Sequence, residues 1–123
     1  MFRIGIIGAG WIAEKMCDAI APFTDIEIYA IASRTTEKAE AFAAEHNIGK
    51  AYGSYEEMVC DPDIDLVYIA TPHSHHYDHA MLALEHGKPV LVEKAFTANA
   101  RQAKELIETA KSKGLFITEA IWT

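Results

Sequence analysis

A glycine-rich turn near the start of the chain has the residue types and spacing of a phosphate-binding loop. Residues Gly8 to Ala13 read GAGWIA, which fits the pattern G-x-G-x-x-G/A between a predicted strand and a predicted helix. Gly8 would allow the tight turn, Gly10 would let a pyrophosphate approach the backbone, and Ala13 would let the helix pack on the strand. The amides of Trp11 and Ile12 would point at the phosphates from the positive end of the helix. The turn predicts a dinucleotide site rather than a plain strand-to-helix connection.

The end of the second predicted strand bears on the choice between NAD and NADP. Proteins that bind NAD in this way carry an acidic residue about 20 residues after the glycines, where it holds the ribose. Here the chain reads Ser33-Arg34-Thr35-Thr36, with no carboxylate at the strand tip. A hydroxyl followed by a guanidinium suits the 2′-phosphate of NADP. NADP is therefore expected, with NAD less favoured. The alternatives for Arg34 are that it lies flat on the adenine or that it faces solvent. We expect Lys38 to face solvent.

Four of the six histidines lie in one segment after the fourth predicted strand, where residues 71–79 read TPHSHHYDH. This segment follows the carboxyl edge of the predicted sheet, where ligands bind in such folds. His75 and His79 have a spacing that could hold a metal on a helix, but no thiolate lies near them in sequence and no carboxylate pattern matches a zinc signature. No metal is expected, and these two are expected on the surface. The residues expected to line the nicotinamide side are Thr71, Pro72, His73 and His76.

A pair of opposite charges, Glu93 and Lys94, follows the apolar run 90–92. Charged side chains at the end of a buried strand need a partner or a ligand. Glu93 could orient Lys94 or bind the nicotinamide ribose, and Lys94 could donate to a substrate oxygen. We therefore expect both residues to contact the cofactor and to take part in catalysis. The alternative is an ordinary ion pair at a strand end.

Strands and helices alternate along the whole chain. The predicted strands are 2–7, 26–32, 51–52, 66–70, 90–92 and 115–118. The predicted helices are 10–21, 36–46 with Thr36 as N-cap, a short one opened by Ser54, 74–86 and 97–113. This alternation predicts an α/β fold, a Rossmann-type doubly wound parallel sheet with helices on both faces and strand order 3-2-1-4-5-6.

The composition is that of a soluble globular protein. The chain has 123 residues, a formal charge of −7, half apolar and about a quarter charged residues, which fits a single domain over 1–123. The acidic balance argues against nucleic-acid binding. No apolar run approaches the ~20 residues needed to cross a bilayer, and the N-terminus does not read as a secretory signal, so we expect a cytoplasmic protein with no membrane partner. The two cysteines, Cys17 and Cys60, are expected to be free thiols.

These motifs together resemble the N-terminal domain of the glucose–fructose oxidoreductase/inositol dehydrogenase (Gfo/Idh/MocA) family. The matches are GAGWIA, Thr71-Pro72 followed by His76, and GKPVLVEK ending at Lys94. The run GLFITEAIWT, residues 114–123, is most similar to the dihydrodiol dehydrogenase branch. Two positions depart from the family pattern: Ala95 stands where a proline is usual, and His73 replaces a common asparagine.

The resemblance implies a function and a larger protein. Family members transfer a hydride between a nicotinamide cofactor and a secondary alcohol in a small-molecule substrate, such as a sugar, a polyol or a trans-dihydrodiol. Their second α/β domain supplies the substrate pocket and usually the oligomer interface. We therefore expect the 123 residues to be a piece of a longer protein, inactive alone, whose parent is a homo-oligomer. The alternative is a stand-alone nucleotide-binding or sensor module without catalysis.

Overall fold

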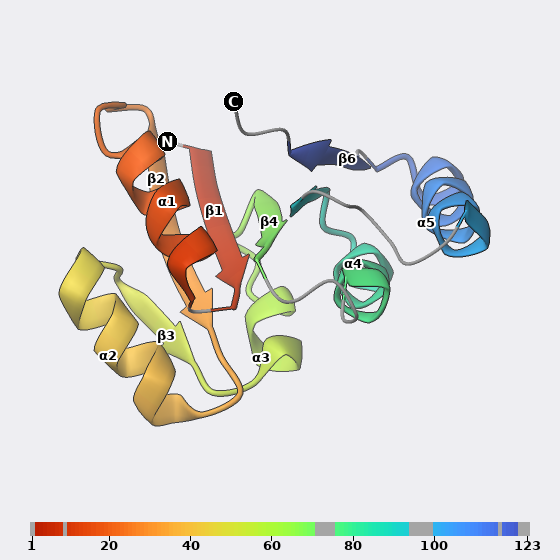
Figure 1. The fold of residues 1–123 in the computed structure, drawn as a ribbon. Coiled ribbons are helices and arrows are strands. Elements are labelled where there is room, and N and C mark those ends of the chain that lie inside the picture. Colours follow the sequence, from red (N-terminus) through yellow and green to blue (C-terminus); the bar gives the residue numbers. More distant parts are fainter. Residues whose placement is uncertain (1, 9, 71–75, 94–99, 116, 121–123) are drawn as a thin grey trace.

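Six parallel strands form one sheet in the order β3-β2-β1-β4-β5-β6 (Figure 1). The computed structural model describes residues 2–8, 10–70, 76–93, 100–115 and 117–120. The strands are β1 (Phe2–Ile7), β2 (Ile26–Ala32), β3 (Lys50–Tyr52), β4 (Leu66–Ile69), β5 (Val90–Glu93) and β6 (Ile117–Ala120). The helices are α1 (Trp11–Ile20), α2 (Thr36–His46), α3 (Tyr55–Val59), α4 (His76–Glu85) and α5 (Ala100–Lys113). The predicted α/β class and strand order are confirmed.

Helices cover both faces of the sheet, and each face has its own apolar core. On one face, α1 and α2 pack with strand residues such as Ile6 and Tyr68. On the other face, α3, α4 and α5 pack with strand residues such as Ile7 and Val67. All four of these strand side chains are fully buried, as expected for central strands whose two faces are both covered. Among the described residues, no helix is long and apolar enough to cross a membrane.

Capping residues set where several helices begin and end. Thr35, not Thr36, is the N-cap of α2, because its hydroxyl accepts a hydrogen bond from the amide of Lys38 at 3.3 Å. The prediction of Thr36 as the N-cap was wrong by one residue, because both threonines carry a hydroxyl that can cap a helix. Ser54 caps α3 as predicted, by accepting from the amide of Glu57. Asn47 ends α2 in the left-handed conformation, with φ 57°.

The sequence predicts that the last strand starts at residue 115, but Leu115 is not part of the strand, whose described residues are Ile117–Ala120. Gly114 has φ 67° and ends α5, as the sequence indicated. The amide of Leu115 then donates to the carbonyl of Ala110 at 2.8 Å, so Leu115 still belongs to the helix end. The apolar run alone does not indicate this hydrogen bond, so the strand predicted from that run starts too early.

Neither cysteine forms a disulfide: Cys17 is half-buried and Cys60 is exposed. Burial, together with the neighbouring charges of Asp18 and Glu14, raises the pKa of the Cys17 thiol to about 11. A thiol with such a pKa stays protonated at neutral pH, and the thiolate is the nucleophilic form. Cys17 is therefore not an activated nucleophile.

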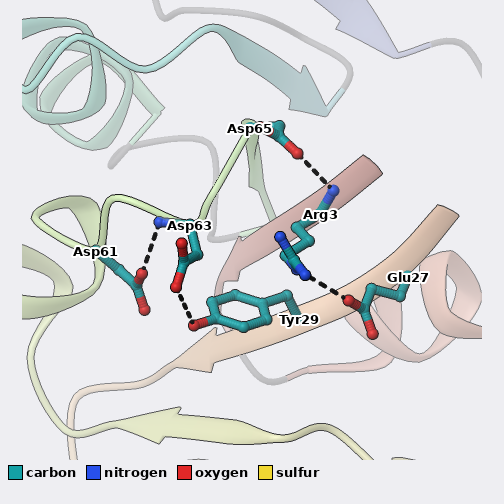
Figure 2. A network of polar contacts seen from close by, with 6 residues as sticks. All are labelled: Arg3, Glu27, Tyr29, Asp61, Asp63 and Asp65. Atoms are coloured by element: carbon teal, nitrogen blue, oxygen red, sulfur yellow. Dashed lines mark hydrogen bonds and ion pairs between the residues drawn. The ribbon is translucent and has the colours of Figure 1, made fainter. Parts of the chain in front are cut away.

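A polar network ties the loop before β4 to strands β1 and β2 (Figure 2). The backbone amide of Arg3 donates to Asp65 at 2.9 Å, and its guanidinium pairs with Glu27 at 3.2 Å. The hydroxyl of Tyr29 donates to Asp63 at 3.4 Å, and the amide of Asp63 donates to the Asp61 carboxylate at 2.9 Å. The network thus holds the loop that leads into the central strand β4.

Asp61 is the buried end of this network, with only 6% of the residue exposed. Its carboxylate accepts the hydroxyl of Tyr52 at 2.6 Å, and its carbonyl accepts from the ammonium of Lys88 at 2.7 Å. Burial opposes ionisation of Asp61, but the hydrogen bonds from Tyr52 and Asp63 and the charge of Lys50 outweigh it. They hold the pKa of Asp61 below its ordinary value.

Replacing Asp61 with alanine is expected to lower the free energy of unfolding by about 1–3 kcal/mol at neutral pH, because Tyr52 and the amide of Asp63 lose their acceptor. The folded pKa of Asp61 is lower than its unfolded value, so its contribution is present above about pH 4 and is lost as the pH falls further. Urea unfolding at pH 7, and in steps down to pH 3, measures both effects. The exposed Asp18→Ala is the control; equal stability of the two variants would contradict the prediction.

Candidate cofactor site

The turn between β1 and α1 has the geometry predicted for a phosphate-binding loop. Gly8 has φ 107°, a conformation that L side chains rarely adopt, and its amide donates to the carbonyl of Ala32 at 2.9 Å. Gly10 is the N-cap of α1, no side chain caps the helix there, and a Cβ at Gly10 would meet no atom within 4 Å. Ala13 is fully buried against the sheet. The start of α1 is therefore open to an anion.

The end of β2 lies beside this turn, because Ala32 accepts the hydrogen bond from Gly8. Ser33 follows Ala32 and is buried, with 6% of the residue exposed, whereas Arg34 and Lys38 are exposed. The amide of Ser33 donates to the carbonyl of Tyr52 at 3.1 Å, which fixes the strand tip against the end of β3. A hydroxyl and a guanidinium thus occupy the place where NAD-binding proteins carry a carboxylate.

A cavity of about 450 Å³ opens at this strand tip. Its walls come from three parts of the chain: the residues after β2, the turn between β3 and α3 with the start of α3, and one side of α4. The lining residues are Ser33, Arg34, Gly53, Ser54, Tyr55, Glu56, Asp78, His79 and Leu82. Ser33 and Arg34, the two residues predicted to bind a 2′-phosphate, therefore line one wall of this cavity.

His79 corrects one expectation from the sequence. It was expected on the surface, but it is half-buried, lines the cavity and lies edge-on to the ring of Tyr55, with ring centroids 4.6 Å apart. The edge-to-face arrangement is one that aromatic pairs favour. The two rings add aromatic surface to a cavity that Ser33 and Arg34 line with polar groups.

The charges that line the cavity are mixed. Arg34 is the guanidinium among its lining residues, and Glu56 and Asp78 are the carboxylates. Burial raises the pKa of Tyr55, and the nearby charge of Arg34 lowers it by less, so the phenol is neutral at physiological pH. An anion in this cavity would therefore depend on Arg34 for charge and on Ser33 for a hydrogen bond.

The other predicted site residues divide into two groups. Glu93 is the last residue of β5 and His76 the first of α4, so their backbones stand at the predicted edge of the sheet. Trp11 and Ile12 form the first turn of α1, where the predicted amide contacts need them. The predicted residues that lie outside the described part of the chain are Thr71, Pro72, His73, His75 and Lys94.

Sequence reasoning missed the residues that close the cavity around Arg34. Tyr55 and Glu56 lie in α3, a helix of five residues, and Gly53 and Ser54 precede it. The signal that could have located them is the Ser54 N-cap, which predicts that a helix begins directly after β3. A helix starting after β3, at the same edge as the glycine turn, brings its first residues to the ligand edge of the sheet.

One group of possible metal ligands occurs in the described part of the chain, at the contact of α1 with α2. The ligand atoms of Glu14, Glu45 and His46 all lie within 4.8 Å of one another. Nε2 of His46 is 3.8 Å from the Glu14 carboxylate, so the two form an ion pair when the histidine is protonated. None of the three lines the cavity beside Arg34. His79, weighed above as a metal ligand, is not in this group.

The doubly wound sheet, the open start of α1 and the cavity at the tip of β2 define a dinucleotide-binding domain of the Rossmann class. The profile of the Gfo/Idh/MocA group, described as "Oxidoreductase family, NAD-binding Rossmann fold", matches residues 2–120. The chain belongs to this oxidoreductase family and is an NAD(P)-binding domain of it. The resemblance noted in the sequence is confirmed.

Individual relatives that are similar in sequence or in structure are longer than this chain. The chain is 51% identical to a D-xylose 1-dehydrogenase (NADP(+)) of Hypocrea jecorina, over 97% of this chain and 34% of that protein. It is 46% identical to a trans-1,2-dihydrobenzene-1,2-diol dehydrogenase of Xenopus tropicalis, over 97% of this chain and 37% of that protein. A crystal structure of KijD10, a 3-ketoreductase of Actinomadura kijaniata in complex with TDP-benzene and NADP, superimposes with a TM-score of 0.90 and 33% identity, covering 96% of this chain and 37% of that one. The chain thus spans about a third of the length of these relatives.

Proposed function

We propose that the chain is the NADP(H)-binding domain of an oxidoreductase that moves a hydride between nicotinamide and the carbon of a secondary alcohol. The observation that carries this proposal is the pairing of the open start of α1 with a neighbouring strand tip that bears Ser33 and Arg34 and no carboxylate. A pyrophosphate needs the first feature, and a 2′-phosphate is favoured by the second.

The glycine turn holds the pyrophosphate in this proposal. Gly8 and Gly10 give the phosphates access to the backbone, and the amides of Trp11 and Ile12 donate to them. The hydroxyl of Ser33 and the guanidinium of Arg34 bind the 2′-phosphate. The mixed charge of the cavity makes Arg34 the main source of attraction for that phosphate.

Residues farther along the same edge of the sheet would hold the reacting end of the cofactor. The bound nicotinamide supplies the hydride acceptor or donor. Glu93, at the end of β5, contacts the nicotinamide ribose and orients Lys94, and Lys94 donates to the oxygen of the alcohol. An ammonium there stabilises the alkoxide that develops as the hydride leaves. The residues that line the nicotinamide side are Thr71, Pro72, His73 and His76.

The substrate is a sugar, a polyol or a trans-dihydrodiol. The names of two relatives support this class, since one is a D-xylose dehydrogenase and the other a dihydrodiol dehydrogenase. These relatives are about three times as long as this chain. We infer that the 123 residues form one domain of a comparably long protein, whose remaining part supplies the walls of the substrate pocket.

The 123-residue chain is expected to bind NADPH without oxidising D-xylose, inositols or trans-dihydrodiols. The proposal places the cofactor contacts in this chain and the walls of the substrate pocket in a further part of the protein, so Lys94 alone would not hold the alcohol in position against the nicotinamide. Holding two reactants in place is worth roughly 7–11 kcal/mol of the barrier to a bimolecular step. NADPH binding is measured by fluorescence titration, and turnover by the absorbance of NADPH formed with each alcohol.

Two outcomes would change the proposal. Steady NADPH production by the purified chain, above a control without protein, would contradict the need for a further domain. Binding of NADPH to the chain, with no turnover of any of these alcohols by the full-length protein, would favour the alternative of a nucleotide-binding or sensor module without catalysis.

A further inference from the structure

The turn between β3 and α3 touches the start of α2 at a position that only a glycine can occupy without movement. A Cβ placed on Gly53 would clash with the hydroxyl oxygen of Thr36 and would lie 3.0 Å from the amide nitrogen and 3.1 Å from the Cα of Thr36. The φ angle of Gly53 is not in the left-handed region, so space rather than backbone conformation requires the glycine.

This contact joins two of the segments that line the cavity. One segment carries Ser33 and Arg34 and ends at Thr35, the N-cap of α2. The other carries Gly53 and Ser54, the N-cap of α3, and leads into Tyr55. One hydrogen bond, from the amide of Ser33 to the carbonyl of Tyr52, links the segments on one side of the contact. The approach of Gly53 to Thr36 is the second link.

We propose that Gly53 is a positioning residue that sets how closely Arg34 approaches a bound 2′-phosphate. This inference rests on the proposed function, because it assumes that the cavity receives the phosphate of NADP. A side chain at position 53 pushes the start of α2 away from the turn before α3. The residues just before α2, Arg34 among them, move with it. NAD lacks the 2′-phosphate, so its affinity depends on the glycine turn and changes little.

The test compares Gly53→Ala with Gly49→Ala. Gly49 lies in the connection between α2 and β3, and a Cβ there would meet no atom within 4 Å, so Gly49→Ala is the matched control. For Gly53→Ala we expect the Kd of NADPH to rise about three- to tenfold and the Kd of NADH to change less than about twofold. This loss of NADPH affinity is smaller than the one to two decades expected when a charge-assisted hydrogen bond to the phosphate is removed completely. Gly49→Ala is expected to keep both dissociation constants.

A double variant separates the contact from a general loss of structure. Thr36→Ala removes the hydroxyl that a Cβ at position 53 would strike, while the contacts of 3.0 Å and 3.1 Å to the backbone of Thr36 remain, so Gly53→Ala/Thr36→Ala is expected to recover part of the wild-type ratio of the two constants. Thr36→Ala alone is expected to keep that ratio, because the cap of α2 is Thr35. If Gly53→Ala unfolds, the double variant, in which the worst clash is absent, carries the comparison with wild type.

Three results would overturn the inference. In one, Gly53→Ala keeps the wild-type ratio of NADPH to NADH affinity. In another, it weakens both cofactors equally, which is the result expected of a merely structural glycine. In the third, the double variant is no better than Gly53→Ala. In each case a wild-type chain that still prefers NADPH leaves the proposed function standing, whereas a wild-type chain that binds neither cofactor overturns both.

Discussion

In the longer dehydrogenase proposed above, Lys94→Met is expected to lower turnover by two or more decades and to change the Kd of NADP by less than about tenfold. An alcohol that loses a hydride must also lose its hydroxyl proton. An ammonium beside the oxygen stabilises the developing alkoxide or passes the proton on, and loss of such a group commonly costs about 10²–10⁴ in rate. The prediction rests on sequence position, since Lys94 follows the last residue of β5.

Steady-state kinetics and a cofactor titration on the same preparation separate the two roles open to Lys94. Lys113→Met, at the exposed end of α5, removes the same charge and is expected to leave both quantities near wild type. If turnover survives in Lys94→Met and cofactor affinity falls instead, Lys94 is a ribose anchor. The group that takes the proton then lies in the part of the protein beyond this domain.

Arg34→Ala is expected to weaken the binding of NADPH by about one to two decades and to leave NADH nearly unchanged. A charge-assisted hydrogen bond between a guanidinium and a phosphate contributes roughly 1.5–3 kcal/mol. Arg34 brings the guanidinium to a cavity whose other charged lining residues are the carboxylates Glu56 and Asp78, so little remains to hold the phosphate after its removal. Isothermal calorimetry of both cofactors measures the change.

Arg101→Ala is the matched control for Arg34→Ala, because it removes an exposed arginine that pairs with Glu105 on α5 and does not line the cavity. It is expected to leave both affinities near wild type. Equal losses in the two variants would mean that net charge, and not a contact with the 2′-phosphate, governs the affinity. An unchanged NADPH affinity in Arg34→Ala would place the phosphate elsewhere.

The sheet and the glycine turn could be predicted from the sequence because local signals fix them. Buried parallel strands appear as apolar runs, and the positive φ of Gly8 is a requirement of the turn that G-x-G encodes. Helix ends were predictable where one residue type decides them, as at Asn47, Gly87 and Gly114, each of which has positive φ. The start of β6 could not be predicted in this way, because the hydrogen bond from the amide of Leu115 to the carbonyl of Ala110 depends on how the chain folds back at the end of α5.

The cavity could not be predicted as a whole, because its walls meet only in the folded chain. Arg34 and Ser33 could be found from their place after β2. Tyr55 and His79 are 24 residues apart in the sequence and belong to different helices, so their edge-on contact follows from the packing of α3 against α4. His79 contacts Tyr55 because it lies on the side of α4 that faces α3. The polar, histidine-rich sequence of this segment does not indicate which side of the helix faces α3.

A calorimetric titration of the wild-type chain with NADPH and with NADH at one salt concentration tests whether this chain binds NADP in preference to NAD. The salt must be held constant because charge pairing with a phosphate weakens as ionic strength rises. The expected result is binding of both cofactors at one site, with NADPH tighter by about one to two decades. Equal affinities, or tighter binding of NADH, would contradict the assignment of Ser33 and Arg34 to the 2′-phosphate.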